Sequence, residues 1–320
     1  MNTNGRPIAI YHEHPLWFRP LFREFDRRGT NYLQVDAKQH SYDIASPDGE
    51  YSLLFNRMSP SAYTRGVGNG IFYTLNYLAS LERSGTRVVN GHKAFTYETS
   101  KALQLSLLQQ LGVAYPRSRV INHASQAVQA SKGLRFPIVV KANIGGSGVG
   151  IVRFDTVALL GKAADAGDLN LGFDGAALVQ EFIPARDGRI MRIEVIGGKF
   201  IYGIRVYSSG DIFDLCPADI CATTSGVELV RSVCAVDAPK NSLTVEAYDP
   251  SPEVISDVER IFAATTIEVG GIESIVDDRD GKLYYYDINA LSNFVAEGPR
   301  VVGFDPYARL ADYLEKEARG

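Results

Sequence analysis

Short apolar runs alternate with amphipathic runs over roughly the first ninety residues. An apolar run at 8–11 is followed by an amphipathic run at 16–28, which Gly29 ends, and by an apolar run at 32–35. The same order returns at 51–55, in a helical pattern at 71–81, and at 87–89. Because strands joined through helices pair side by side in one direction, the pattern predicts β-α-β units and a parallel sheet.

A glycine cluster at 66–70 in this region superficially suggests a dinucleotide-binding loop. The fingerprint requires G-x-G-x-x-G directly after the first strand, whereas this cluster has different spacing and lies well beyond 51–55. The sequence therefore predicts a β-α-β region whose glycines do not match a dinucleotide site.

Leucines at 103, 107 and 111 predict a helix over 96–111, which Gly112 ends. Lys101 lies in its first turn, where the helix dipole mildly disfavours a cation unless an anion is bound nearby. A solvated surface lysine is the alternative interpretation.

The segment 136–152 joins an apolar strand, Lys141 and glycines at 145, 146, 148 and 150. Glycine backbones can present bare N–H groups to phosphate oxygens, and the lysine adds a positive charge, so the segment is typical of a polyphosphate site. An ordinary hairpin turn with a lysine that reaches the surface is the alternative. With a second buried strand at 177–183, the region about 118–183 is predicted to form a small separate lobe.

Near the C-terminus, apolar segments at 271–276 and 282–289 flank an acidic turn and predict a β-hairpin. Folding about Asp280 sets Glu273 opposite Asp287, and strand alternation places Asn289 on the same face. A divalent cation with oxygen ligands would remove the repulsion between the carboxylates. Two solvated carboxylates are the alternative, and a calcium loop fails because Val276 stands where a carboxylate is required.

Composition narrows the functional classes. A chain of 320 residues with 45% hydrophobic residues exceeds one typical domain, and a net charge of -4 with scattered Lys and Arg argues against a nucleic-acid partner. The 3 cysteines match neither a zinc site nor a disulfide framework. No leader or membrane-spanning segment is recognisable, so we expect a cytoplasmic protein with no membrane partner.

In this chain order, the motifs resemble the ATP-grasp superfamily, and in particular its RimK-like glutamate ligase branch. The resemblance is carried by residues 88–90, Lys101, 111–116, 139–150, 180–183, 192–199, 203–206 and 287–289. It implies an α/β (α+β) fold with an N-terminal Rossmann-like pre-ATP-grasp domain at 1–92 and an ATP-grasp domain at 93–320. The latter would comprise the small lid lobe at about 118–183 and a lobe for Mg²⁺ and phosphate at about 184–320.

Carried over by position, the resemblance implies a role for each motif residue. ATP would contact Lys101, Lys141, a flap containing Gly145, Gly146, Ser147 and Gly148, and a hinge of Gln180, Glu181, Phe182 and Ile183. Mg²⁺, with Mn²⁺ as an alternative, would be held by Glu273, Asp287 and Asn289, while Arg192 and Arg205 would face the reacting groups.

The sequence departs from the branch at two places. Ile190 stands where an acidic residue usually contacts the ribose, so Asp187 becomes the candidate for that contact. Asp287 replaces the usual glutamate, and the segment after Asn289 differs from the family, so Ser292 and Asn293 could define a different acceptor pocket.

The resemblance implies a carboxylate-amine ligase that forms an amide or peptide bond through an acyl-phosphate. Arg57 and Arg65, expected in loops, could recognise a carboxylate on either small-molecule substrate, although surface arginines are the commoner outcome. The alternatives are a small-molecule kinase and a nucleotide-binding module without turnover. The oligomeric state stays open, with a homo-oligomer as one option.

Overall fold

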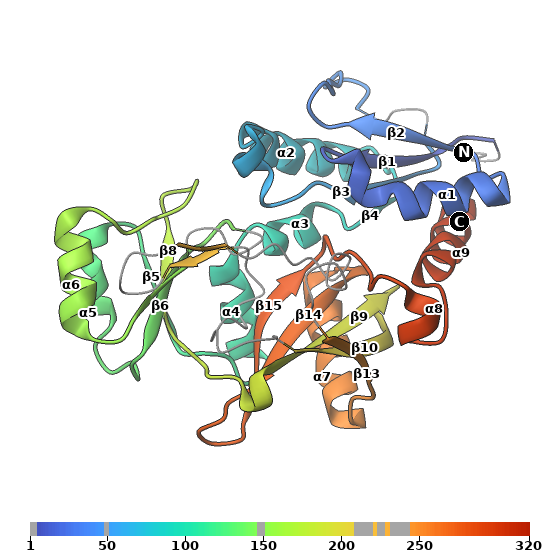
Figure 1. Ribbon diagram of the computed structural model, residues 1–320. Coiled ribbons are helices and arrows are strands. Elements are labelled where there is room, and N and C mark those ends of the chain that lie inside the picture. Colours follow the sequence, from blue (N-terminus) through green and yellow to red (C-terminus); the bar gives the residue numbers. More distant parts are fainter. Residues whose placement is uncertain (1–4, 48–50, 146–150, 208–219, 223–227, 231–243) are drawn as a thin grey trace.

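The computed structural model describes residues 5–47, 51–145, 151–207, 220–222, 228–230 and 244–320, which form three β-sheets with flanking helices (Figure 1). For 220–222 and 228–230 only the backbone is described. None of the helices in these described ranges is long and apolar enough to cross a membrane.

The N-terminal sheet is parallel, as the alternating pattern predicted, with strand order β2-β1-β3-β4. Its strands are β1 (Ile8–His12), β2 (Tyr32–Asp36), β3 (Leu53–Arg57) and β4 (Val88–Val89). Two helices, α1 (Arg19–Arg28) and α2 (Asn69–Arg83), cover its two faces. Side-chain alternation explains this, because Ile8 and Ile10 pack with α1 while Ala9 and Tyr11 pack with α2.

The single helix predicted over 96–111 is wrong. The structure has α3 (His92–Glu98) and α4 (Lys101–Gln110), separated at Thr99 and Ser100. The Ser100 hydroxyl accepts a hydrogen bond from Leu103 N–H, so Ser100 caps a new helix and Lys101 is its first residue.

The lid sheet has strand order β12-β11-β7-β6-β8-β5. Its strands are β5 (Ser118–Ile121), β6 (Ile138–Ala142), β7 (Ile151–Phe154), β8 (Ala177–Glu181), β11 (Ile220–Ala222) and β12 (Glu228–Val230). One face packs against α5 (Ala127–Ala130) and α6 (Val157–Ala166). The sheet therefore extends beyond the predicted lobe at 118–183, because β11 and β12 join it from later in the chain.

The central sheet is antiparallel, with strand order β13-β10-β9-β14-β15. Its strands are β9 (Arg189–Ile196), β10 (Lys199–Tyr207), β13 (Thr244–Tyr248), β14 (Val269–Val276) and β15 (Leu283–Asn289). The last two are the predicted hairpin, which is confirmed. Helix α7 (Pro252–Thr265) packs on one face of this sheet.

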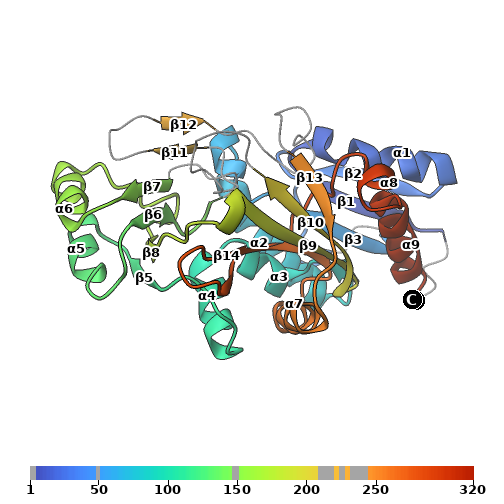
Figure 2. The same ribbon diagram turned by 60° about the horizontal axis from the view of Figure 1, so that its bottom comes forward.

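The chain then returns to the N-terminal sheet. After α8 (Gly298–Val301), helix α9 (Pro306–Arg319) packs beside α1 (Figure 1). Helix α4 lies between the lid sheet and the central sheet (Figure 2). Leu105 and Leu108 of α4 pack in one cluster with Leu178 of the lid and Ile288 of β15. Helix α4 thus contacts both sheets that carry the predicted site residues.

Candidate active site

Two carboxylates face each other on the central sheet. Glu273 pairs directly with Asp287 across β14 and β15, as the hairpin predicted, and Glu273 also pairs with Arg192 across β14 and β9. Directly opposed residues point to the same face, so all three side chains share one side of the sheet. The Asn289 amide donates to Asp287 Oδ2 at 3.4 Å, which places the third predicted metal ligand beside the pair.

Each carboxylate has a cation beside it. Lys101 Nζ donates to Asp287 Oδ1, and Arg192 Nη1 lies 3.3 Å from Glu273 Oε1. Burial raises the pKa of the Glu273 carboxyl to about 7, and the Arg192 guanidinium opposes this effect. Burial also acts to raise the pKa of Asp287, but the ammonium groups of Lys101 and Lys141 outweigh it and hold that pKa below its usual range.

Lys141 reaches the same volume from the lid. Its neighbours Ile138 and Val140 pack toward α5 and α6, so alternation along β6 turns Lys141 to the opposite face, where it is 6% exposed. It pairs there with Leu178, which packs in the cluster containing α4. Lys101 of α4 therefore contacts Asp287, and Lys141 of β6 lies close enough to lower the pKa of the same carboxyl. Of the predicted flap, Gly145 is described, and Gly146, Ser147 and Gly148 lie outside the described residues.

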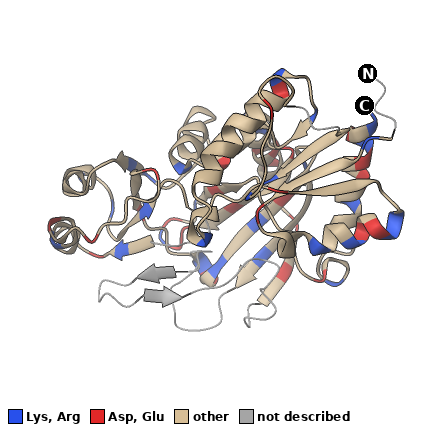
Figure 3. Ribbon diagram, turned by 90° about the horizontal axis from the view of Figure 1, so that it is seen from above, with Lys and Arg blue, Asp and Glu red and all other residues tan. Residues whose placement is uncertain are grey.

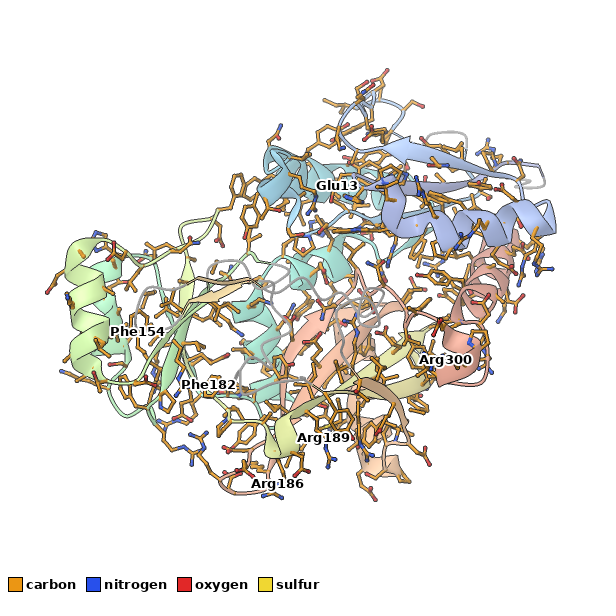
Figure 4. All side chains as sticks on the ribbon, viewed as in Figure 1. Glu13, Phe154, Phe182, Arg186, Arg189 and Arg300 are labelled. Atoms are coloured by element: carbon orange, nitrogen blue, oxygen red, sulfur yellow. The ribbon has the colours of Figure 1, made fainter. Side chains whose placement is uncertain are left out.

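The predicted adenine hinge lies where the lid sheet ends and the chain turns toward β9 (Figure 4). Gln180 donates to Ser118 Oγ at 2.8 Å, while the Glu181 carboxylate accepts from Arg135 N–H at 2.8 Å on the other face of the sheet. Phe182 N–H donates to Pro137 O at 3.0 Å. In the described ranges we find no acceptor for Ile183 N–H, so this group remains for a ligand.

The resemblance implied that Glu181 contacts the base and Asp187 the ribose, but each carboxylate has a partner within the protein. The Glu181 carboxylate is occupied by Arg135 N–H and lies 3.6 Å from Arg117, so it does not point openly toward a base. Asp187 pairs with Arg189 at 3.1 Å and is 59% exposed at the surface.

Arg192 is held in a buried network that the sequence did not reveal. Its Nε donates to Glu194 Oε1 at 2.6 Å and its Nη2 donates to Ser292 Oγ at 2.6 Å. Ser292 Oγ in turn donates to Glu194 Oε2 at 2.5 Å, and Glu194 is fully buried. The signal for Glu194 was a second charge two residues after Arg192 within an apolar strand, which puts both on one face.

The expected loop position of Arg57 was wrong, because Arg57 lies in a strand. Arg57 is the last residue of β3, is 4% exposed, and donates to Ala290 O at 3.2 Å and to Ser292 O at 2.7 Å. It is thus a buried clamp on the segment that carries Ser292 and Asn293. Arg65 lies in a 3₁₀ turn and forms an ion pair with the buried Glu13 at 2.5 Å.

Arg205 does not join the other predicted residues. Across β9 and β10 it pairs with Met191, one position out of phase with Arg192, so it points to the opposite face of the sheet. Its guanidinium lies 4.7 Å from the centre of the Tyr248 ring.

The oxygen groups fit a hard divalent cation shared with phosphate. No group of three or more His, Cys, Asp or Glu side chains capable of holding a metal occurs in the described ranges. The candidate ligands are therefore the carboxylates of Glu273 and Asp287 and the amide oxygen of Asn289. Mg²⁺ is usually bound in this way, through one or two carboxylates plus substrate phosphates. Glu273 Oε2 is buried and has no hydrogen-bond partner of normal geometry among the described residues, although the nearby Tyr286 hydroxyl lowers the pKa of this carboxyl.

Comparison with known proteins identifies the fold. Over 97% of this chain and 98% of the other, the structure superposes on the ATP-grasp ligase PsnB complexed with a phosphomimetic minimal precursor, Mg and ADP, with a TM-score of 0.67 and 18% identity. A RimK domain ATP-grasp protein from Sphaerobacter thermophilus gives a TM-score of 0.67 at 20% identity over 96% of this chain and 98% of the other. The molecule has the ATP-grasp fold, as predicted.

The family model of the RimK-like ATP-grasp domain matches residues 98–214. This match confirms the predicted resemblance. A relative from Teredinibacter turnerae, named a probable alpha-L-glutamate ligase, is 29% identical over 209 residues, covering 62% of this chain and 66% of the relative. The matched region spans less than two thirds of the length of the curated relatives.

Proposed function

We propose that this protein is an ATP-dependent carboxylate-amine ligase that forms an amide or peptide bond through an acyl-phosphate. The observation that carries the proposal is the hydrogen bond from Lys101 to Asp287 of the facing Glu273–Asp287 pair, with Lys141 of the lid close enough to lower the pKa of the same Asp287 carboxyl. Cations from two lobes around paired carboxylates suit a triphosphate with its metal. The names of the relatives, probable alpha-L-glutamate ligases, agree with this class of reaction.

Glu273, Asp287 and Asn289 would hold Mg²⁺, with Mn²⁺ as an alternative. When bound, the metal supplies positive charge that neutralises phosphate oxygens. Lys101 and Lys141 would bind phosphate oxygens by charge-assisted hydrogen bonds, and Gly145, Gly146, Ser147 and Gly148 would contact the nucleotide. The unpaired N–H of Ile183 supports the hinge as the base-binding edge.

Arg192 is our candidate for stabilising charge on the reacting carboxylate and the transferred phosphoryl group. Its guanidinium lies beside Glu273 and is fixed by Glu194 and Ser292, so it is oriented before substrate arrives. The opposite facing of Arg205 argues against a matching role for that residue. Ser292 and Asn293, clamped by Arg57, would border the acceptor, which we take to be a small amine, an amino acid or a peptide.

A trapping experiment tests this function. The protein is incubated with ATP, Mg²⁺, hydroxylamine and a panel of amino acids and other small acids, and hydroxamate and ADP are measured. A ligase gives hydroxamate with its own acid, because hydroxylamine intercepts the acyl-phosphate, and Asp287→Asn gives little. ADP formed with a phosphorylated alcohol and no hydroxamate would show a kinase. ATP binding without ADP release across the panel would show a binding module.

A further inference from the structure

The two facing carboxylates are neutralised within the protein by two cations. Lys101 is paired with Asp287, and Arg192 lies beside Glu273 at 3.3 Å. Glu273 and Asp287 oppose each other directly in the strand register, so without these cations their charges would repel at short range. A divalent ion that enters this volume therefore meets positive charge as well as its oxygen ligands.

The two cations are held very differently. Arg192 is fixed by Glu194 and Ser292 through short hydrogen bonds of 2.6 Å, and Glu194 is itself enclosed. A Cβ at Gly271 would lie 2.7 Å from the Glu194 carboxylate, so the glycine at that position leaves the room that this network occupies. Arg192 cannot leave Glu273 without disturbing its hydrogen bonds to Glu194 and Ser292.

Lys101 has fewer hydrogen bonds, although the carboxylates of Glu98 and Glu273 also attract its ammonium group. Its ammonium donates to Asp287, and no second hydrogen-bond acceptor for it occurs in the described ranges. The lysine stem is long, begins in the first turn of α4, and can swing without moving the helix. Lys141 lies close enough to act on the same carboxylate, so Asp287 is under the influence of two ammonium groups.

We propose that Lys101 is an exchangeable counter-ion that couples metal binding to nucleotide binding. A divalent cation takes Asp287 only as Lys101 leaves it, and the released ammonium then binds phosphate. Arg192 stays in place throughout. The metal and nucleotide therefore bind cooperatively, with Lys101 carrying the coupling. This inference rests on the proposed function for the identity of the nucleotide, whereas its metal part stands on the geometry alone.

The test is a Mn²⁺ titration of the full chain, followed by the electron paramagnetic resonance signal of free Mn²⁺, without nucleotide and with a non-hydrolysable ATP analogue. Lys101→Met removes the positive charge that competes with Mn²⁺ for Asp287. Mn²⁺ binding without nucleotide should then tighten by about tenfold or more, since unit charges in contact near a protein surface interact strongly. Lys101→Arg keeps the charge and should stay within about twofold of the wild type. In Lys101→Met the nucleotide should increase the Mn²⁺ affinity less than it does in the wild type, because the side chain that couples the two binding events is missing.

Two control variants distinguish a failure of the counter-ion role from a failure of the metal site. Lys199→Met removes an exposed lysine that pairs with Glu259 and should leave Mn²⁺ binding unchanged. Asp287→Asn should weaken it strongly. Lys101→Gln repeats the neutral substitution with a smaller apolar surface, and unfolding curves show that each variant is folded.

An unchanged Mn²⁺ affinity in both neutral variants, with Asp287→Asn still weakened, would overturn the counter-ion role and leave the metal site intact. Equal tightening in Lys101→Arg and Lys101→Met would also overturn it, because charge would then be irrelevant. Normal Mn²⁺ binding in Asp287→Asn would instead refute the metal site on which the proposed function depends.

Discussion

Buried polar side chains fix the segment that follows Asp287. Glu98 accepts from Ala290 N–H, and Gln104 donates to Ile288 O at 2.8 Å while accepting from Ile288 N–H at 3.1 Å. Asn90 donates to Ala290 O at 2.9 Å. Each of these residues comes from the chain before residue 105, so the metal and acceptor residues are positioned by partners distant in sequence.

Glu98 gives a prediction about pH. Burial raises its pKa from 4.5 to about 7, so between these values the folded state binds a proton that the unfolded state does not. Stability should then fall as pH rises through this window. Glu98→Gln keeps an oxygen acceptor for Ala290 N–H and cannot ionise, so it should remove this part of the pH dependence.

Urea unfolding at pH 5.5 and pH 7.5 measures the effect. The wild type should lose roughly 2 kcal/mol more than Glu98→Gln between the two pH values. Glu82→Gln changes a carboxylate that accepts from His92 N–H at the surface and is the matched control. Parallel pH profiles for the wild type and Glu98→Gln would mean that Glu98 stays ionised in the folded protein.

At the residue scale, the sequence predicted the ion-pairing residues better than the buried residues that hold them in position. Glu273, Asp287 and both lysines were found because a hairpin turn sets the register and charged residues interrupt apolar strands. Glu194 and Glu98 were missed, since their importance depends on contacts with Arg192 and Ala290 that no local pattern encodes. Arg205 was assigned by resemblance, and strand alternation turns it to the other face.

At the scale of elements, the first N–H groups of α4 are capped by Asn143 of the lid and by Ser100. Lys101 N–H donates to Asn143 O at 3.3 Å, Ala102 N–H to Asn143 Oδ1 at 2.9 Å, and Leu103 N–H to Ser100 Oγ at 3.3 Å. The first three N–H groups of the helix are therefore satisfied, two of them by Asn143. The Asn143 amide also donates to Asp174 at 2.7 Å, which fixes Asn143 within the lid.

Asn143→Ala should weaken both the fold and the site. The variant should lose about 1 kcal/mol of stability, as for other helix caps, and should bind ATP more weakly because the spacing between Lys101 and Lys141 is no longer fixed. Calorimetric titration with an ATP analogue and thermal unfolding measure the two effects. Thr156→Ala removes the cap of α6 and should lower stability alone. Similar ATP affinities in both variants would contradict the positioning role of Asn143.

The break between α3 and α4 shows what limited the prediction of elements. The apolar spacing at 103–111 indicated a helix, and α4 lies there, but the capping residue Ser100 was read as helix interior. A serine at that position can either cap a helix or lie within one, and Asn143, which decides between them here, is distant in sequence.

At the scale of the whole molecule, three sheets meet around the site, and their contacts are long-range. Helix α9 returns to α1, where Arg28 donates to Asp312 at 2.6 Å, and nothing local in the sequence predicts this docking. Positive and negative segments are interspersed over the described ribbon, in line with the scattered charges of the sequence (Figure 3). The parallel pairing of the N-terminal sheet and the β14–β15 hairpin were predicted, whereas the packing between sheets was not.

The lid also contacts the N-terminal part of the chain through aromatic rings. Phe173 of the lid stacks on Tyr63 at 5.9 Å and on Phe72 at 5.7 Å between ring centres. Gly68 lies beneath it, where a Cβ would come within 2.6 Å of the Phe173 ring. Ile144, directly before the predicted flap, packs in the same cluster as Met58 and Tyr63. The lid is therefore held on one side by α4 and on the other by these rings.

Loss of the aromatic contact should release bound nucleotide faster. Phe173→Ala removes stacking worth about 1 kcal/mol, so dissociation of a fluorescent ATP analogue, measured by stopped flow, should accelerate roughly two- to tenfold. Phe72→Ala should act in the same direction, and the double variant should add little, because both substitutions remove one contact. Leu159→Ala on the exposed face of α6 is the control in the same lobe. Additive effects of the Phe173 and Phe72 substitutions, or dissociation rates equal to that of Leu159→Ala, would show that the rings do not hold the lid closed over nucleotide.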